Sequence, residues 1–155
     1  MQFKLVAMGG TFDIIHVGHI TLIEKAASIS EKIIIGLTSD SLAAKNGKNI
    51  TNNFKQRFEN LKKTLDDKFP GNSFEIAELN DDFGPAVIEG DVDALVVSEE
   101  TSKKGDILNT MRKKQNLSPV EIIIVPMKMA SDGDRISSTR IRNSEIDISG
   151  NTLVD

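Results

Sequence analysis

Cysteine is absent from this chain of 155 residues. Its absence excludes disulfides, thiolate metal sites and cysteine nucleophiles, and it favours a cytosolic location. Tryptophan and tyrosine are absent too, so stacking platforms for single-stranded nucleic acid rest on seven phenylalanines alone. No run approaches the roughly 20 apolar residues of a membrane span. These absences predict a protein that neither coats nucleic acid nor enters a membrane.

The charge balance leads in the same direction. Nineteen basic residues stand against 23 acidic ones, which gives a net charge of -4. Proteins that coat nucleic acid usually carry a basic excess, whereas small phosphates need only a few local cations. The apolar start, residues 1–6, is typical of a first strand and not of a signal peptide. We therefore expect a cytoplasmic protein that binds small molecules.

Apolar runs alternate with amphipathic stretches along the chain. We expect strands at 3–8, 32–37, 73–79, 94–97 and 120–125, and helices at 17–28, 42–45, 54–69, 102–115 and from 138 onward. Residues 86–89 form one helical turn at most. This order predicts an α/β fold, a single-domain Rossmann-like parallel five-stranded sheet with helices on both faces. The domain spans 1–155, the polar residues 143–155 are expected to form a surface tail suited to a partner, and self-association of the protein stays open.

The only two histidines lie three residues apart, in His16-Val17-Gly18-His19 at the start of a predicted helix. Free backbone N–H groups and the helix dipole make such a turn an anion site, and a histidine there stabilises charge on a phosphoryl group. Gly18 lets a phosphate approach the backbone closely. The alternative is a pair of structural histidines. A metal site is disfavoured because only a carboxylate such as Asp13 is near to help.

Ligands of parallel sheets bind beyond the carboxyl ends of the strands, so residues there are candidates. After the first strand come Gly9, Gly10 and Thr11, which suit phosphate oxygens but also suit an ordinary turn. The chain has no Walker A sequence and no Gly-x-Gly-x-x-Gly, the two commonest nucleotide signatures.

The segment after the last strand places hydroxyls at a helix start. Its candidates for binding nucleotide phosphates are Ile136, Ser137, Ser138, Thr139 and Arg142. Hydroxyls, orphan N–H groups and a guanidinium together suit the phosphates of a nucleotide. The alternative is a Ser/Thr-capped helix whose arginines pair with Asp132, Asp134 or Glu145.

Other candidates follow the second and fourth strands. Thr38 and Ser98 end these strands, Lys45 directly precedes the polar loop 46–53, and Lys48 lies within that loop. A flexible lysine there suits an acceptor phosphate, although most such lysines are simply solvated. Thr101 has an alternative role as the N-cap of the next helix.

Several stretches together resemble one known family. They are residues 9–13 (GGTFD), 16–19 (HVGH), 79–86 (LNDDFGPA), 96–101 (VVSEET) and 136–142 (ISSTRIR), with Asn109 and Arg112. The first, second and last resemble the HxGH nucleotidyltransferase superfamily. The middle ones are similar to the archaeal type of phosphopantetheine adenylyltransferase and to the matching domain of eukaryotic coenzyme A synthase.

This resemblance implies that ATP and 4'-phosphopantetheine give dephospho-coenzyme A and pyrophosphate, with Mg²⁺ accompanying the ATP. It implies that His19 stabilises the transferring group, that His16 and Thr11 hold phosphate oxygens, and that Lys45 meets the acceptor phosphate. Residues 81–86 depart from the family pattern Asp-Pro-Tyr-Gly-Pro-Ala, so no polar role carries over to Phe83. The loop 46–53 also lacks an expected proline, which leaves Lys45 and Lys48 both open.

Rival functions share the end motifs. They are nicotinamide-mononucleotide or flavin adenylyl transfer, cytidylyl transfer, and a non-catalytic nucleotide-binding sensor. The sensor predicts ATP binding without turnover.

Overall fold

The computed structural model describes residues 2–84, 90–99, 101–126, 129–134, 136 and 138–153, with the backbone alone at 138 and 139. The elements are β1 (Phe3–Gly10), α1 (Val17–Ile29), β2 (Ser30–Thr38), α2 (Asp40–Lys45), α3 (Phe54–Lys68), β3 (Ser73–Leu79), β4 (Ala94–Ser98), α5 (Lys103–Lys114), β5 (Glu121–Val125) and α6 (Ser138–Arg142). The predicted turn at 86–89, Ser137 and the side chains of Ser138 and Thr139 lie outside the description.

The five strands form one sheet in the order β3-β2-β1-β4-β5, and every pairing is parallel. The chain builds outward from β1 through β2 to β3, then returns to the other side of β1 with β4. The direction of building therefore reverses between β1 and β4, and the crevice at their carboxyl ends is where ligands of such sheets bind. The predicted fold class is confirmed.

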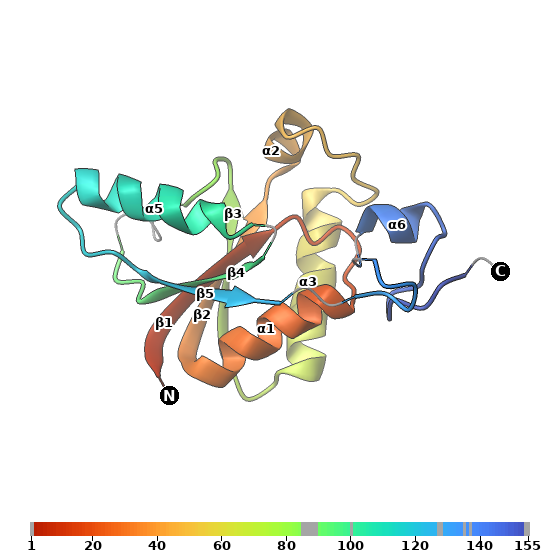
Figure 1. Cartoon of the computed structure of the whole chain (residues 1–155), viewed down its shortest axis with the longest axis horizontal. Helices are drawn as coiled ribbons and strands as arrows, with labels where there is room; N and C mark the ends of the chain where they lie inside the picture. Colours follow the sequence, from red (N-terminus) through yellow and green to blue (C-terminus); the bar gives the residue numbers. More distant parts are fainter. Residues whose placement is uncertain are drawn as a thin grey trace.

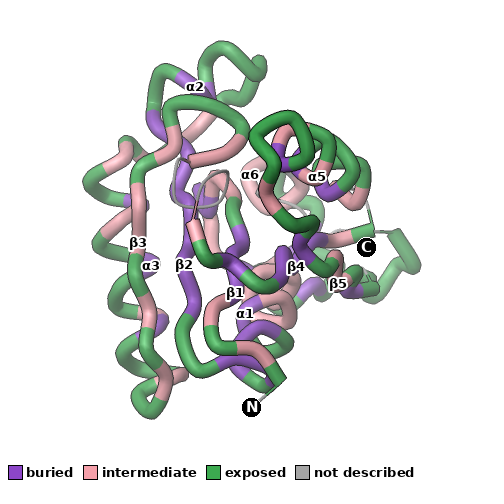
Figure 2. Tube along the Cα trace, turned by 90° about the vertical axis from the view of Figure 1, so that its left-hand side faces the viewer, coloured by how far each residue is buried: buried purple, intermediate pink, exposed green. Residues whose placement is uncertain are grey.

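Two apolar layers cover the sheet (Figure 1). On one face Val6 and Met8 of β1 join the buried side of α1 and α3. On the other face Ala7 of β1 packs with Leu95 and with Leu108 of α5. Successive side chains of a strand point to opposite faces, so one strand supplies both layers. Figure 2 shows the consequence, with burial concentrated in the central strands and only intermediate or exposed residues in β3 at the edge.

The strands β1, β2 and β4 extend further than their apolar runs. β1 includes Gly9 and Gly10, which pair with Gly36 and Leu37 of β2. Backbone pairing with β2, and not side-chain hydrophobicity, extends the strand through Gly9 and Gly10. The first strand therefore delivers its carboxyl end directly to the Thr11–His19 region.

Residues 143–153 are held against the rest of the fold and do not form a loose tail. Ile146 is 0% exposed and packs with Ala130 and Ile136. The carbonyl of Ile148 accepts a hydrogen bond from Val17 N–H at the start of α1, with an N–O distance of 2.9 Å. One buried isoleucine is too weak a pattern to predict docking from sequence, yet it anchors the segment against α1.

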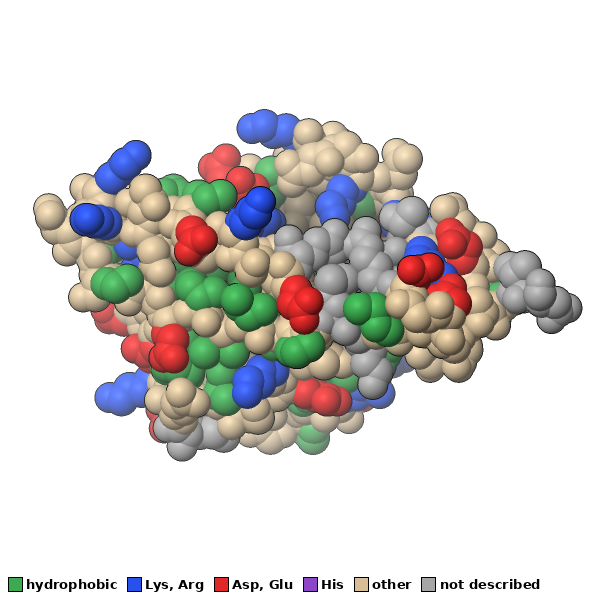
Figure 3. Space-filling view, viewed as in Figure 1, with side chains coloured by type: hydrophobic (Ala, Val, Ile, Leu, Met, Phe, Trp, Pro, Cys, Tyr) green, Lys and Arg blue, Asp and Glu red, His purple; other side chains and the backbone are tan. Residues whose placement is uncertain are grey.

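The surface carries charges of both signs. On the face in Figure 3, basic and acidic side chains are interspersed and do not gather into a patch of one sign. Within the described part of the chain no helix is long and apolar enough to cross a membrane.

Candidate functional site

The two histidines close the amino end of α1. His16 is the N-cap, and its Nδ1 accepts the Gly18 N–H at 3.1 Å. His19 returns the bond, because its Nδ1 accepts the His16 N–H at 3.2 Å. Both Nδ1 atoms are thus acceptors, so each neutral ring carries its proton on Nε2. The pair presents two N–H donors from a fixed helix end.

The prediction of free backbone N–H groups at this turn is wrong. The Val17 N–H is bound by Ile148, and the His16 side chain takes both the Gly18 and the His19 N–H groups. The sequence distance between 17 and 148 hid the first partner, and the reciprocal histidine cap hid the second. An anion at this helix end would therefore meet imidazole N–H donors before it met the backbone.

Packing keeps both imidazoles uncharged. Their rings stack with centroids 3.8 Å apart, and Phe12 packs against His19 at 4.8 Å. Burial lowers the pKa of His16 from 6.5 to about 4. Burial, followed by the nearby charges of His16 and Lys48, lowers the pKa of His19 to about 3. At neutral pH the dyad is a neutral pair of hydrogen-bond donors.

We expect neither histidine to titrate between pH 5 and 8 in the ligand-free protein. Since the unfolded chain has ordinary histidine pKa values, it binds more protons below pH 6.5, and the free energy of unfolding should fall as the pH drops from 6.5 toward 4 and 3. Imidazole chemical shifts report the titration, and each of the two histidines is assigned by a single substitution. A midpoint near 6.5 for either ring would contradict this environment.

Gly18 is required by the histidine ring itself. A Cβ at Gly18 would stand 2.9 Å from Cε1 and 3.0 Å from Nδ1 of His16. The same addition at Gly9 meets its nearest atom, the Gly36 carbonyl oxygen, at 3.4 Å, which is an ordinary contact. Gly18 is predicted to let a phosphate approach closely, and the structure shows a second role, which is to leave room for the His16 ring.

The Gly18→Ala variant should therefore displace the His16 ring and lower kcat by about tenfold, the scale for losing one hydrogen bond to a charged group. The matched Gly71→Ala variant should retain kcat within about twofold, because a Cβ added at Gly71 meets no atom within 4 Å. Steady-state kinetics on both variants test this. Equal losses of kcat in the two variants would show that the loss does not come from displacing the His16 ring.

Asp13 is turned inward by the residue before it. Phe12 is buried and has φ of +50°, in the left-handed region that a bulky side chain rarely adopts. This turn directs the Asp13 carboxylate to the N–H groups of Thr51 and Asn52, at 2.9 to 3.1 Å. Asp13 also pairs with Arg142 of α6. Local strain at a site is maintained only where the surroundings enforce it, as these contacts do.

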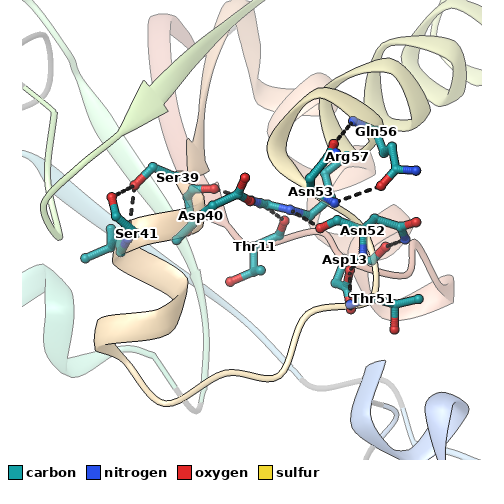
Figure 4. Close-up of polar contacts among 12 residues, drawn as sticks. Thr11, Asp13, Ser39, Asp40, Ser41, Thr51, Asn52, Asn53, Gln56 and Arg57 are labelled. Carbon is teal, nitrogen blue, oxygen red and sulfur yellow. Dashed lines mark hydrogen bonds and ion pairs between the residues drawn. The ribbon is translucent and has the colours of Figure 1, made fainter.

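Arg57 of α3 lies beneath the carboxyl ends of β1 and β2 and is 0% exposed. Its Nη1 donates to the carbonyls of Thr11 at 2.9 Å and Thr38 at 2.7 Å. Its Nε donates to the Asn52 carbonyl, and Nη2 pairs with Asp40 at 2.8 Å (Figure 4). The hydrogen bond from Arg57 lowers the pKa of Asp40. Helical periodicity placed Arg57 on α3 but gave no sign of these distant carbonyl partners.

The acceptor-side candidates differ in setting. The Thr38 hydroxyl donates to the Gly10 carbonyl at 3.1 Å and so joins β2 to β1. Ser98 and Thr101 bond each other through their hydroxyls at 3.1 Å, and Ser102 is the N-cap of α5, so the N-cap role considered for Thr101 is wrong. Lys45 and Lys48 are both exposed, and only Lys48 is among the charges that lower the pKa of His19.

The two arginines of α6 have different partners, which match the two roles considered for them, pairing with nearby carboxylates or lying at the site. Arg140 pairs with Asp132 and Glu145, as expected for a structural helix. Arg142 instead reaches Asp13, next to the His16–His19 motif. The segment after the last strand, through α6, therefore places one cation next to Asp13. Among the described residues no group of three or more His, Asp or Glu side chains could hold a metal ion.

Comparisons with known proteins bear on this site. The family model described as cytidylyltransferase-like matches residues 7–144. A phosphopantetheine adenylyltransferase of Methanosarcina acetivorans is 45% identical over 148 residues, covering 94% of this chain and 93% of that protein. One from Methanothermobacter thermautotrophicus is 38% identical over 152 residues, covering 98% and 91%. A solved structure from Archaeoglobus fulgidus, described as of unknown function, superimposes with a TM-score of 0.73 at 30% identity, covering 86% of this chain and all of that one.

Proposed function

The chain belongs to the cytidylyltransferase-like family and, within it, to the phosphopantetheine adenylyltransferases, and on that premise we propose how it transfers adenylyl from ATP to 4'-phosphopantetheine. An oxygen of the acceptor phosphate forms a bond to the α-phosphorus of ATP. The bond from that phosphorus to the bridging oxygen of the β-phosphate breaks. The products are dephospho-coenzyme A and pyrophosphate, a step in coenzyme A biosynthesis.

The observation that carries this mechanism is the neutral histidine dyad at the switch point of the sheet. The acceptor phosphate is already an anion at neutral pH, so the reaction needs no general base. It needs donors placed where charge grows on the transferring group. The Nε2–H groups of His16 and His19 supply such donors, fixed by the α1 cap, and Thr11, directly after β1, is proposed to hold a phosphate oxygen with them.

The nucleotide side is proposed at α6. Arg142 binds ATP phosphates there, together with Ile136, Ser137, Ser138 and Thr139 of the sequence motif. Support comes from the position of Arg142, whose guanidinium already lies against Asp13 beside the dyad. A guanidinium suits two phosphate oxygens at once, which favours Arg142 over a lysine for this role.

The acceptor side is proposed at the loop after α2. The charge of Lys48 reaches His19 electrostatically, and Lys45, the last residue of α2, is not among the charges that do. This favours Lys48 over Lys45, which the family resemblance implied, as the cation for the acceptor phosphate. Thr38 and Ser98, at the ends of β2 and β4, complete the proposed acceptor pocket.

No cluster of three or more His, Asp or Glu side chains in the described part of the chain could hold a metal ion, and the Asp13 carboxylate is engaged by Arg142 and two backbone N–H groups. Mg²⁺ is proposed to arrive with ATP, whose phosphates supply most of its ligands and whose charge it partly neutralises. Cytoplasmic location and self-association stay predictions.

The test is pyrophosphate release from ATP with a panel of acceptors. Release is expected with 4'-phosphopantetheine and not with nicotinamide mononucleotide, flavin mononucleotide or an alcohol phosphate. Release with nicotinamide mononucleotide but none with phosphopantetheine would assign the chain to another adenylyltransferase. ATP binding without release from any acceptor would identify a sensor.

A further inference from the structure

Asp13 is a buried carboxylate that contacts both proposed substrate sides. Its side chain is 3% exposed. The oxygens accept the Thr51 N–H at 3.0 and 3.1 Å and the Asn52 N–H at 2.9 Å. The Asn52 side chain donates in turn to the Asp13 carbonyl at 2.8 Å. These contacts fix the end of the loop that carries Lys48.

The other partner of the same carboxylate comes from 129 positions later in the chain. Arg142 ends α6, its guanidinium contacts Asp13, and its side chain is 22% exposed. A guanidinium has five N–H donors in a plane, and it can therefore hold a carboxylate and a phosphate together. One carboxylate thus joins the nucleotide-side helix to the acceptor-side loop.

We propose that Asp13 is a positioning residue that transmits nucleotide binding at Arg142 to the backbone of Thr51 and Asn52, and so sets the acceptor loop. The inference rests on the proposed function for the identity of the nucleotide. When phosphates fix the guanidinium, the Asp13 carboxylate is fixed with it, and its hydrogen bonds to the two N–H groups open less often. The acceptor loop becomes more ordered once ATP is bound.

The Asn52 carbonyl gives this loop a second attachment, to Arg57 Nε at 3.1 Å. Arg57 also holds the carbonyls of Thr11 and Thr38, so Asn52 lies between two buried polar side chains beneath the site (Figure 4). Arg57 makes no contact with α6 that the structure shows among the described residues. Among the contacts that the structure shows for the described residues, those of Asp13 with Arg142 and Asn52 join α6 to this loop.

Amide hydrogen exchange on the full chain tests the proposal without requiring turnover. A non-hydrolysable ATP analogue should slow exchange of the Thr51 and Asn52 amides several-fold in the wild type. In Arg142→Met, studied at a saturating concentration of the analogue, the slowing should disappear. Asp13 keeps its hydrogen bonds to the two backbone N–H groups in this variant, but it loses the guanidinium that contacts the phosphates. The Lys4 and Leu5 amides are the matched control, since Asp93 binds them in the same way at the opposite end of the sheet, at 3.1 and 3.0 Å.

A second variant separates positioning from stability. Asp13→Asn should raise the KM for ATP by about tenfold, the effect of one hydrogen bond to a charged group. Combined with Arg142→Met it should add little further, because both changes remove one link. Asp93→Asn should leave the KM for ATP and the KM for the acceptor unchanged.

The outcomes are distinct. Failure of the wild type to bind the analogue, measured by calorimetry, would overturn the proposed function together with this inference. Binding of the analogue with unchanged exchange at Thr51 and Asn52, or equal slowing in Arg142→Met, would overturn the inference alone. Additive effects of Asp13→Asn and Arg142→Met on the KM for ATP would also overturn it.

Discussion

His19→Ala is expected to lower kcat by roughly 100-fold or more, the scale for loss of one preorganised donor to a developing anion. His19 provides one of the two Nε2–H groups, and its neighbour His16 cannot replace it, because the His16 ring is held in place as the cap of α1. The KM for ATP should change much less than kcat. Steady-state kinetics with both substrates measures the split.

The same change has a structural side that needs its own control. His19 also accepts the His16 N–H, so part of the loss would reflect a loosened cap. His19→Asn keeps a side-chain acceptor near that N–H and shortens the donor, so it should restore stability and leave kcat low. Near-normal turnover in either variant, with the fold intact, would remove His19 from the mechanism.

Arg57→Met is expected to cost about 3 kcal/mol of unfolding free energy or more, because buried carbonyls lose their donor and each such loss costs about 1–3 kcal/mol. The carbonyls are those of Thr11, Thr38 and Asn52. Asp40 loses its partner too, but it is half exposed and water can solvate it. Urea unfolding followed by circular dichroism gives the free energy.

Lys62→Met is the matched control on the same helix. Lys62 forms an exposed ion pair with Asp66 at 3.0 Å. Pairs of this kind contribute about 0.5 kcal/mol or less, so the substitution should be nearly neutral. Similar losses in both variants would show that Arg57 acts as a generic helix residue and does not tie the strand ends together.

Local patterns in the sequence predicted the fold well. The strand at 73–79 matches β3 exactly in its bounds, and the others differ by a few residues at their ends. Continuous apolar runs are decisive in a sheet covered on both faces, and side chains that alternate between the faces then fill both layers. The two rare histidines, three residues apart, pointed to the candidate site for a similar reason, because the relevant spacing is local.

What the sequence did not reveal is long-range. Arg57 and Asp13 look like ordinary members of a helix and a turn, and their roles come from carbonyls, N–H groups and a guanidinium far along the chain. The same holds for Val17 and Ile148, whose backbone bond uses up an N–H that the sequence appeared to leave for a phosphate. Polar partners of this kind have no periodicity, and only the folded chain brings them together.

The central claim is adenylyl transfer to phosphopantetheine at the histidine dyad, and one measurement tests it most directly. The protein is incubated with ATP labelled at the α-phosphorus and with 4'-phosphopantetheine, and the products are separated by mass. The account predicts that the label appears in dephospho-coenzyme A, that the pyrophosphate is unlabelled, and that His19→Ala forms both products far more slowly. Bound ATP that yields no labelled dephospho-coenzyme A would contradict it.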